Sequence, residues 1–143
     1  MFVISIEVVA AVIKCNDEIF CVQRKDEGPL AKKWEFPGGK LEKGETSEEA
    51  LIRELREELN VNVMIKDYIM TVKYQYPTFF ITMHAYFCDV ENKEIVLNEH
   101  LDSKWLHYEK LDSLDWSEAD IPIVQKIKAL QESRVQVWMT MAD

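Results

Sequence analysis

The segment from residue 46 to residue 60 constrains the fold most, because it specifies a helix with two different faces. Thr46 and Glu49 match a capping box, and Asn60 tolerates the left-handed conformation in which many helices end. At about 100 degrees per residue, one apolar stripe contains Ile52, Leu55 and Leu59. Burial of this stripe would fix the direction in which the opposite face of the helix points.

Three carboxylates, Glu54, Glu57 and Glu58, share that opposite face. Like charges at these spacings repel each other by a few tenths of a kcal/mol per pair, in a chain whose formal net charge is already -9. One interpretation is a solvated face held by ion pairs with the interspersed arginines. The other is a set of oxygen ligands of the kind that Mg²⁺ and Mn²⁺ prefer.

The rest of the chain predicts strands around this helix and a second helix near the end of the sequence. Runs of β-branched and aromatic residues predict a hairpin at 3–13 and 19–23, strands at 61–73 and 79–90, and short strands at 95–97 and 103–106. Helical spacing of apolar residues predicts a helix from about 120 to 132. Residues 135–141 alternate like a strand but fit a helical extension or a free tail equally well. Together these elements predict one α/β domain layered around a mixed sheet.

Composition restricts the partners and the cellular compartment. The excess of 26 acidic over 17 basic residues argues against a nucleic-acid polymer or a membrane surface as partner. Three cysteines without a C-x-x-C pair suit a reducing compartment, and neither a signal peptide nor a membrane span is evident. We therefore expect a cytoplasmic protein, either a monomer or a homodimer. The three histidines are expected to be structural or exposed.

The residues before the helix decide between the two interpretations of the carboxylates. From Gly39 to Val61 the sequence reads GKLEKGETSEEALIRELREELNV. It resembles the Nudix box, G-x5-E-x7-R-E-U-x-E-E-x-G-U with U aliphatic, at every defined position except Asn60, where the family has glycine. The resemblance implies a Nudix α/β/α sandwich with a central mixed β-sheet over residues 1–133, followed by a tail at 134–143 of unspecified structure.

The resemblance also implies roles for individual residues. The implied catalytic set is Glu45, Arg53, Glu54, Glu57 and Glu58. The implied metal ligands are Glu54, Glu57, Glu58, Glu99 and the carbonyl of Gly38, with Mg²⁺ as the ion and Mn²⁺ as a substitute. Glu54 is the strongest candidate to orient or deprotonate the attacking water. An ion pair between Arg53 and Glu45 is expected to hold the loop against the helix.

Beyond the box, the resemblance narrows to MutT-like nucleoside triphosphate pyrophosphohydrolases. The implied substrate-binding residues are Arg24, Phe36, Gly38, Gly39, Lys40, Phe80 and Asp120. Arg24 would contact a phosphate, and Phe36 and Phe80, or alternatively Tyr76 or Phe79, would stack on the base. Asp120 would read the base by accepting from an exocyclic amine as an ionised carboxylate, although an aspartate there is also a favoured helix cap.

The expected reaction is Mg²⁺-dependent hydrolysis of modified or non-standard nucleoside triphosphates, such as 8-oxo-dGTP or (d)CTP, to a nucleoside monophosphate and pyrophosphate. Such an activity would cleanse the nucleotide pool. One alternative is a Nudix hydrolase of another nucleoside diphosphate derivative, namely ADP-ribose, a nucleotide sugar or a dinucleoside polyphosphate. The other is a non-catalytic nucleotide sensor, which is disfavoured because every carboxylate of the box is present.

Overall fold

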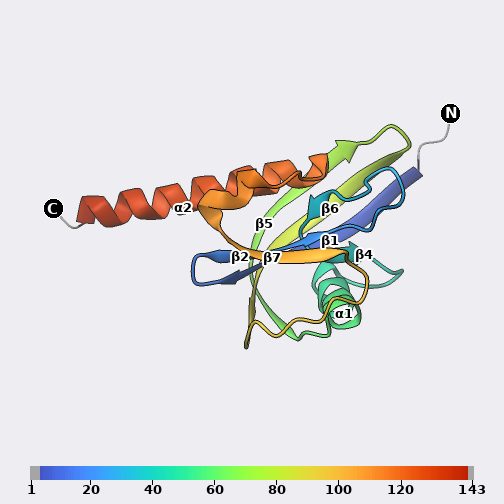
Figure 1. Ribbon diagram of the computed structural model, residues 1–143, viewed down its shortest axis with the longest axis horizontal. Coiled ribbons are helices and arrows are strands. Elements are labelled where there is room, and N and C mark those ends of the chain that lie inside the picture. The colour runs from blue at the N-terminus through green and yellow to red at the C-terminus, as the bar shows by residue number, and fades with distance from the viewer. Residues whose placement is uncertain (1–3, 142–143) are drawn as a thin grey trace.

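A seven-stranded mixed sheet with one helix on each face forms the molecule (Figure 1). The computed structural model describes residues 4–141. The strands are β1 (Ile4–Cys15), β2 (Glu18–Gln23), β3 (Trp34–Glu35), β4 (Gly38–Lys40), β5 (Val63–Gln75), β6 (Phe79–Val90) and β7 (Asp102–His107). The helices are α1 (Ser47–Leu59) and α2 (Ile121–Met141), with short 3-10 turns η1 (Tyr108–Ser113) and η2 (Glu118–Asp120). The predicted α/β domain with a mixed sheet is confirmed.

The strand order explains why the sheet is mixed. The main path runs β3-β2-β1-β6-β5, while β4 pairs with β1 and β7 pairs with β2. β1 and β6 are parallel from Ile4 and Phe79 to Ile13 and Cys88, and the other pairings are antiparallel. The predicted β1–β2 hairpin is present, with Asn16 at a positive φ of 57° in its turn. The prediction of a strand at 95–97 is wrong, because residues 91–101 form the loop between β6 and β7.

Both faces of the sheet are buried, and β1 shows this by alternation. Val9, Ala11 and Ile13 pack on the α1 side, whereas Ala10 and Val12 pack on the α2 side. α1 buries Ala50, Leu51, Leu55 and Leu59, and α2 buries Ile123, Val124 and Ile127 together with Gln131. The stripe predicted for α1 was therefore wrong in one residue. Ile52 is 40 % exposed, because the row through Leu51, Leu55 and Leu59 faces the sheet.

The caps of α1 set where the helix begins and ends. The Thr46 hydroxyl accepts from the Glu49 backbone N–H at 3.1 Å, and the Glu49 carboxylate accepts from the Thr46 N–H at 3.0 Å. At the other end Asn60 is left-handed, with φ 52° and ψ 41°, and its N–H donates to the Arg56 carbonyl at 3.1 Å. Because both ends are fixed, the rotation of the helix about its axis is fixed as well.

The C-terminal helix is longer than expected. α2 continues for 21 residues to Met141, so the helical alternative for residues 135–141 is the one the structure adopts. Its last turns project past the end of the sheet (Figure 1). In this part of α2 the apolar residues Val135, Val137, Trp138, Met139 and Met141 are exposed. Within residues 4–141 no helix is long and apolar enough to cross a membrane.

The cap at Asn60 provides a test of how much the end of α1 contributes to stability. Asn60→Ala should lower the free energy of unfolding by about 1 kcal/mol, because an ordinary side chain is strained in the left-handed region. Asn60→Gly should keep it within about 0.5 kcal/mol of the unsubstituted protein, because glycine adopts this conformation without strain. Urea unfolding of the three proteins measures the difference. Equal stability of the alanine and glycine variants would contradict the proposed role of the cap.

Candidate active site

Arg53 joins the loop that follows β4 to α1. Its Nε and Nη2 atoms donate to the two carboxylate oxygens of Glu45 at 2.7 and 2.8 Å, and Nη2 also donates to the Lys40 carbonyl at 3.0 Å. These hydrogen bonds from Arg53 lower the pKa of Glu45 to about 2. The ion pair that the sequence interpretation placed here is formed. The contact of Lys40 with Arg53 is through its backbone, and the Lys40 side chain is exposed.

Two glycines allow this loop to pack closely. A Cβ on Gly39 would lie 2.3 Å from the carboxyl carbon of Glu54, so only glycine leaves room for that carboxylate. A Cβ on Gly38 would lie 1.8 Å from the backbone oxygen of Val9, against the β1 strand with which β4 pairs. Gly39 therefore shapes the space around Glu54, whereas Gly38 preserves the β1–β4 pairing.

Carboxylates from α1, β3 and the 91–101 loop gather around Glu58. Burial raises the pKa of Glu58 to about 9, and the neighbouring charges of Glu54, Glu99 and Glu35 raise it in the same direction. Glu99 belongs to the 91–101 loop, which Asn98 attaches to the end of α1. The Asn98 N–H and side-chain amide donate to the carbonyls of Glu58 and Glu57 at 3.1 and 2.9 Å. Asn98 thus satisfies free carbonyls at the helix terminus and brings Glu99 to the cluster.

The sequence interpretation assigned no role to Asn98. Its position directly before Glu99, a candidate metal ligand, was the only sequence signal for such a role. No role was assigned to Glu35 either, although its charge acts on both Glu58 and Asp120. Glu35 lies on β3 between the buried Trp34 and Phe36, so alternation along the strand was the signal that its side chain faces away from the core.

The donor set fits a hard divalent cation. Glu54, Glu58 and Glu99 could supply oxygen ligands, and a bound cation would offset both the burial of Glu58 and the repulsion between the carboxylates, which together raise its pKa. Among residues 4–141, however, no three acidic, histidine or cysteine side chains are already arranged as a metal site. Arg53 is one reason, because its Nη1 lies 3.0 Å from a Glu54 oxygen and 3.3 Å from a Glu57 oxygen. Glu57 in particular is directed to Arg53.

Arg24, the expected phosphate contact, is held by Glu35. Its Nη1 donates to one oxygen of Glu35 at 3.0 Å, and His100 Nε2 lies 3.3 Å from the other oxygen. The side chain of His100 is only 7 % exposed, and its Nδ1 has no hydrogen-bond partner among the described residues. His100 is thus a buried neighbour of the carboxylate cluster. A phosphate that bound Arg24 would have to replace Glu35 as its partner.

Asp120 connects the start of α2 to β3 and the loop after it. It is 5 % exposed, and its Oδ2 accepts from the backbone N–H of Phe36, 84 residues away in sequence, at 2.9 Å. This long-range hydrogen bond takes the place of the helix cap that the sequence also allowed. Burial, and then the charge of Glu35, raise the pKa of Asp120 well above its ordinary value. Burial thus opposes the ionised state that the sequence interpretation assumed, whereas the hydrogen bond from Phe36 favours it.

The aromatic side chains near Asp120 come from one face of the sheet. The Phe36 ring lies 4.7 Å from that of Trp116, and Tyr76 stacks on Phe79 at 4.8 Å. Tyr76 also accepts from the backbone N–H of Ala119, next to Asp120, at 2.9 Å. Phe80 points to the opposite face, because its neighbours Phe79 and Ile81 pack in the α2-side core. The structure therefore does not bring Phe80 to Asp120, and Tyr76 and Phe79 are the aromatic residues on that side.

Comparison with known proteins agrees with this arrangement. Residues 5–127 match the model of the NUDIX domain. The chain belongs to the NUDIX family. Hydrolases of this family generally use a divalent metal ion, as the carboxylate cluster on α1 also indicates. The match covers both halves of the site, from the loop before α1 to the start of α2.

Two curated NUDIX relatives from Escherichia coli (strain K12) are each 33 % identical to this chain. The CTP pyrophosphohydrolase aligns over 90 % of this chain and 96 % of its own length. The 8-oxo-dGTP diphosphatase aligns over 80 % and 89 %. Among solved structures, the E. coli ORF135 protein superposes with a TM-score of 0.79 at 33 % identity, covering 92 % of this chain and 94 % of that one.

Substitution of the two glycines before α1 should have different effects, on metal binding for Gly39 and on stability for Gly38. Gly39→Ala should displace the Glu54 carboxylate, weakening Mn²⁺ binding at least about fivefold while changing stability by less than about 1 kcal/mol, because a side-chain end can move. Gly38→Ala should cost at least about 2 kcal/mol of stability, because the clash is with backbone. Mn²⁺ titration and urea unfolding measure the two effects. A Gly39→Ala protein that binds Mn²⁺ normally would contradict this assignment.

Proposed function

We propose that this NUDIX protein hydrolyses nucleoside triphosphates to a nucleoside monophosphate and pyrophosphate, with modified or non-standard substrates such as 8-oxo-dGTP or (d)CTP. The observation that carries the proposal is the Nudix box, with all its carboxylates, folded around Arg53, and with Glu54, Glu58 and Glu99 gathered on one side. The two 33 % identical relatives, a CTP pyrophosphohydrolase and an 8-oxo-dGTP diphosphatase, support the substrate class.

Mg²⁺ is the proposed cofactor, with Mn²⁺ as a substitute. The residues that would hold it are Glu54, Glu57, Glu58, Glu99 and the carbonyl of Gly38. Glu57 would join this set by leaving Arg53, whose other acceptors remain. Bound there, the cation would offset the negative charge of the phosphates and acidify a water for attack.

The chain's own residues would position the water and the phosphates. Glu54 is the proposed residue that orients or deprotonates the water, and Arg53 holds the Glu54 carboxylate at 3.0 Å. Gly39 gives the phosphates access to this carboxylate, because no side chain stands between the loop and Glu54. Arg24 would bind a phosphate oxygen, since a guanidinium suits such an anion at least as well as its present partner Glu35.

The proposed base pocket lies between Phe36 and the start of α2. There Asp120 uses Oδ2 to accept from the Phe36 N–H, which leaves its other oxygen for the base. Because its pKa is raised, a protonated Asp120 would offer a hydroxyl donor as well as acceptor capacity. A site of this kind would accept a base edge that carries both an amine and a carbonyl. Tyr76 and Phe79 supply apolar surface nearby.

The proposal is tested by assaying pyrophosphate release with Mg²⁺ from a panel of normal and oxidised nucleoside triphosphates, with ADP-ribose included. A triphosphate should be the best substrate. Glu54→Gln and Glu58→Gln should each lower turnover at least about tenfold, or roughly 1.4 kcal/mol. Glu132→Gln, on an exposed residue of α2, is the matched control and should leave turnover unchanged. Preferential hydrolysis of ADP-ribose, or full activity of both glutamine variants, would refute the proposal.

Asp120→Asn tests whether Asp120 selects among nucleobases. The amide keeps an acceptor for the Phe36 N–H but cannot ionise or offer a hydroxyl, so folding should be retained. We expect the ratio of kcat/KM between oxidised purine and cytosine triphosphates to change by at least about fivefold, within the range that one buried hydrogen bond provides. Asp120→Ala is less informative, because it leaves a buried N–H unsatisfied. A lower kcat/KM for all bases in equal proportion would show that Asp120 is structural only.

A further inference from the structure

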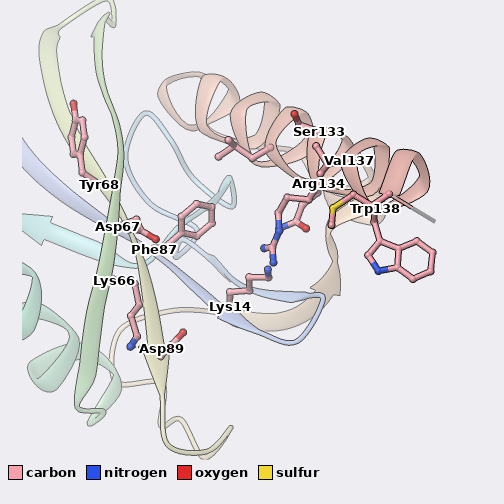
Figure 2. Close-up of a pocket in the computed structure, with 13 residues that line it drawn as sticks. Lys14, Lys66, Asp67, Tyr68, Phe87, Asp89, Ser133, Arg134, Val137 and Trp138 are labelled. Carbon is pink, nitrogen blue, oxygen red and sulfur yellow. Dashed lines mark ion pairs between the residues drawn. The ribbon is translucent and has the colours of Figure 1, made fainter. Parts of the chain in front are cut away.

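A groove of about 750 Å³ lies between the C-terminal half of α2 and the sheet (Figure 2). We call it the α2 groove, and its walls include Lys14, Tyr68, Phe87, Arg134, Val137 and Trp138. No residue that lines it belongs to the active site proposed above. Its helical wall starts at Leu130, beyond residue 127 where the match to the NUDIX domain ends. The groove is therefore not accounted for by the family's site.

Two basic side chains face each other in the α2 groove. Lys14 extends from the end of β1 and Arg134 from α2, and their charged ends point toward one another (Figure 2). Partial burial, and then the charge of Arg134, lower the pKa of Lys14. Neither side chain forms an ion pair with any residue between 4 and 141, whereas Lys66 in the same groove pairs with Asp89 at 3.7 Å. The charges of Asp17 and Asp89 act on the Lys14 pKa in the opposite direction, but neither carboxylate pairs directly with Lys14.

The charge of the groove contrasts with that of the chain. Three basic side chains line it, those of Lys14, Lys66 and Arg134, against the two acidic ones of Asp67 and Asp89. The residues that line the groove thus carry a net charge of +1, in a protein whose net charge is -9. A local positive field of this kind favours an anion between Lys14 and Arg134.

The opposite end of the groove is apolar and open to solvent. Trp138 is 72 % exposed and Met141 79 % exposed, and Arg134 is the one charged residue from 133 to 141. Exposed apolar side chains that adjoin one another, as Val137, Trp138 and Met141 do here, often mark a binding site. The volume lies within the roughly 300 to 1,000 Å³ of small-molecule sites.

We propose that the α2 groove binds a small aromatic anion, with its anionic group between Lys14 and Arg134 and its aromatic body against Trp138. This inference goes beyond the proposed hydrolysis and does not depend on it. A second copy of the chain is the competing occupant of the exposed helix. A dimer through this face would remove both Lys14–Arg134 pairs from water, and burying two facing cations is costly.

Anilinonaphthalene sulfonate is a suitable probe, because it is an aromatic anion whose fluorescence rises in an apolar site. It should bind the purified full-length protein in one-to-one ratio and quench the fluorescence of Trp138, the most exposed of the large hydrophobic residues after Met141. N-phenylnaphthylamine, the matched ring system without the sulfonate, should bind at least about fivefold more weakly, and added salt should reduce only sulfonate binding.

Variants assign the binding to the groove. Arg134→Glu should weaken binding of the sulfonate at least about tenfold, and the protein should stay folded because opposite charges would then face each other. Lys14→Gln should weaken it in the same direction. Lys126→Gln, on an exposed lysine of the same helix outside the groove, is the control and should bind normally. Trp138→Ala should remove the quenching, whereas Met139→Ala, which does not line the groove, should retain it.

Three results would overturn the proposal. Equal binding of the neutral and anionic probes would show that the basic pair is irrelevant. Unchanged affinity in a folded Arg134→Glu protein, verified by thermal unfolding, would place the probe elsewhere. A stable dimer in sedimentation that Trp138→Ala dissociates would assign the apolar end of α2 to a second copy. None of these measurements uses nucleotide hydrolysis, so they remain separate from the test of the proposed activity.

Discussion

The rest of the site depends on the guanidinium of Arg53. It donates to both oxygens of Glu45 and to the Lys40 carbonyl, and its Nη1 faces Glu54 and Glu57. A planar group with five N–H donors in a fixed fork can satisfy acceptors from the loop and from the helix together. Lysine could not, because its ammonium is a point charge on a flexible stem. One side chain therefore fixes the loop and aligns the carboxylates beside it.

Packing of α1 against the sheet opposes the repulsion on its other face. Leu51, Leu55 and Leu59 are fully buried, and each such burial stabilises by roughly 1.5 to 3 kcal/mol. That gain exceeds the few tenths of a kcal/mol per like-charge pair on a helix surface. Glu58 avoids part of the remaining cost through its raised pKa. The hydrophobic face thus allows the helix to hold charges together that would separate in a mobile segment.

Local signals in the sequence were sufficient for much of the fold. The capping box at Thr46, the end of the helix at Asn60 and the β1–β2 hairpin depend on neighbouring residues, and each was predicted where it lies. The resemblance to the Nudix box likewise predicted the pairing of Arg53 with Glu45, because both residues belong to the same loop–helix segment. The family and the single mixed-sheet domain followed from the same residues.

Features that depend on contacts between distant parts of the chain could not be predicted from local sequence. Ile52 and Leu51 are equally apolar, and only the position of the sheet decides which one is buried. Phe80 and Phe79 differ by one step of strand alternation, which places them on opposite faces. The sequence left the end of α2 ambiguous between strand and helix. Its apolar residues are exposed in the structure, so burial on one face did not impose a helical spacing on them. Roles for Glu35 and Asn98 required knowing which loops meet at the end of α1.

The segment from β3 to β4 is where the two functions of the proposed site meet. Phe36 donates its N–H to Asp120 at the proposed base pocket, and only two residues later Gly38 begins the strand beside the carboxylates. Glu35, directly before Phe36, raises the pKa of both Asp120 and Glu58. β3 pairs with β2, and β4 pairs with β1. A base that altered the hydrogen bond of Asp120 would therefore act on the same short backbone segment that carries the Gly38 carbonyl, a proposed metal ligand. In the proposed site, recognition of the base and placement of the phosphates would be linked through residues 36–38 and would need no movement of a separate domain.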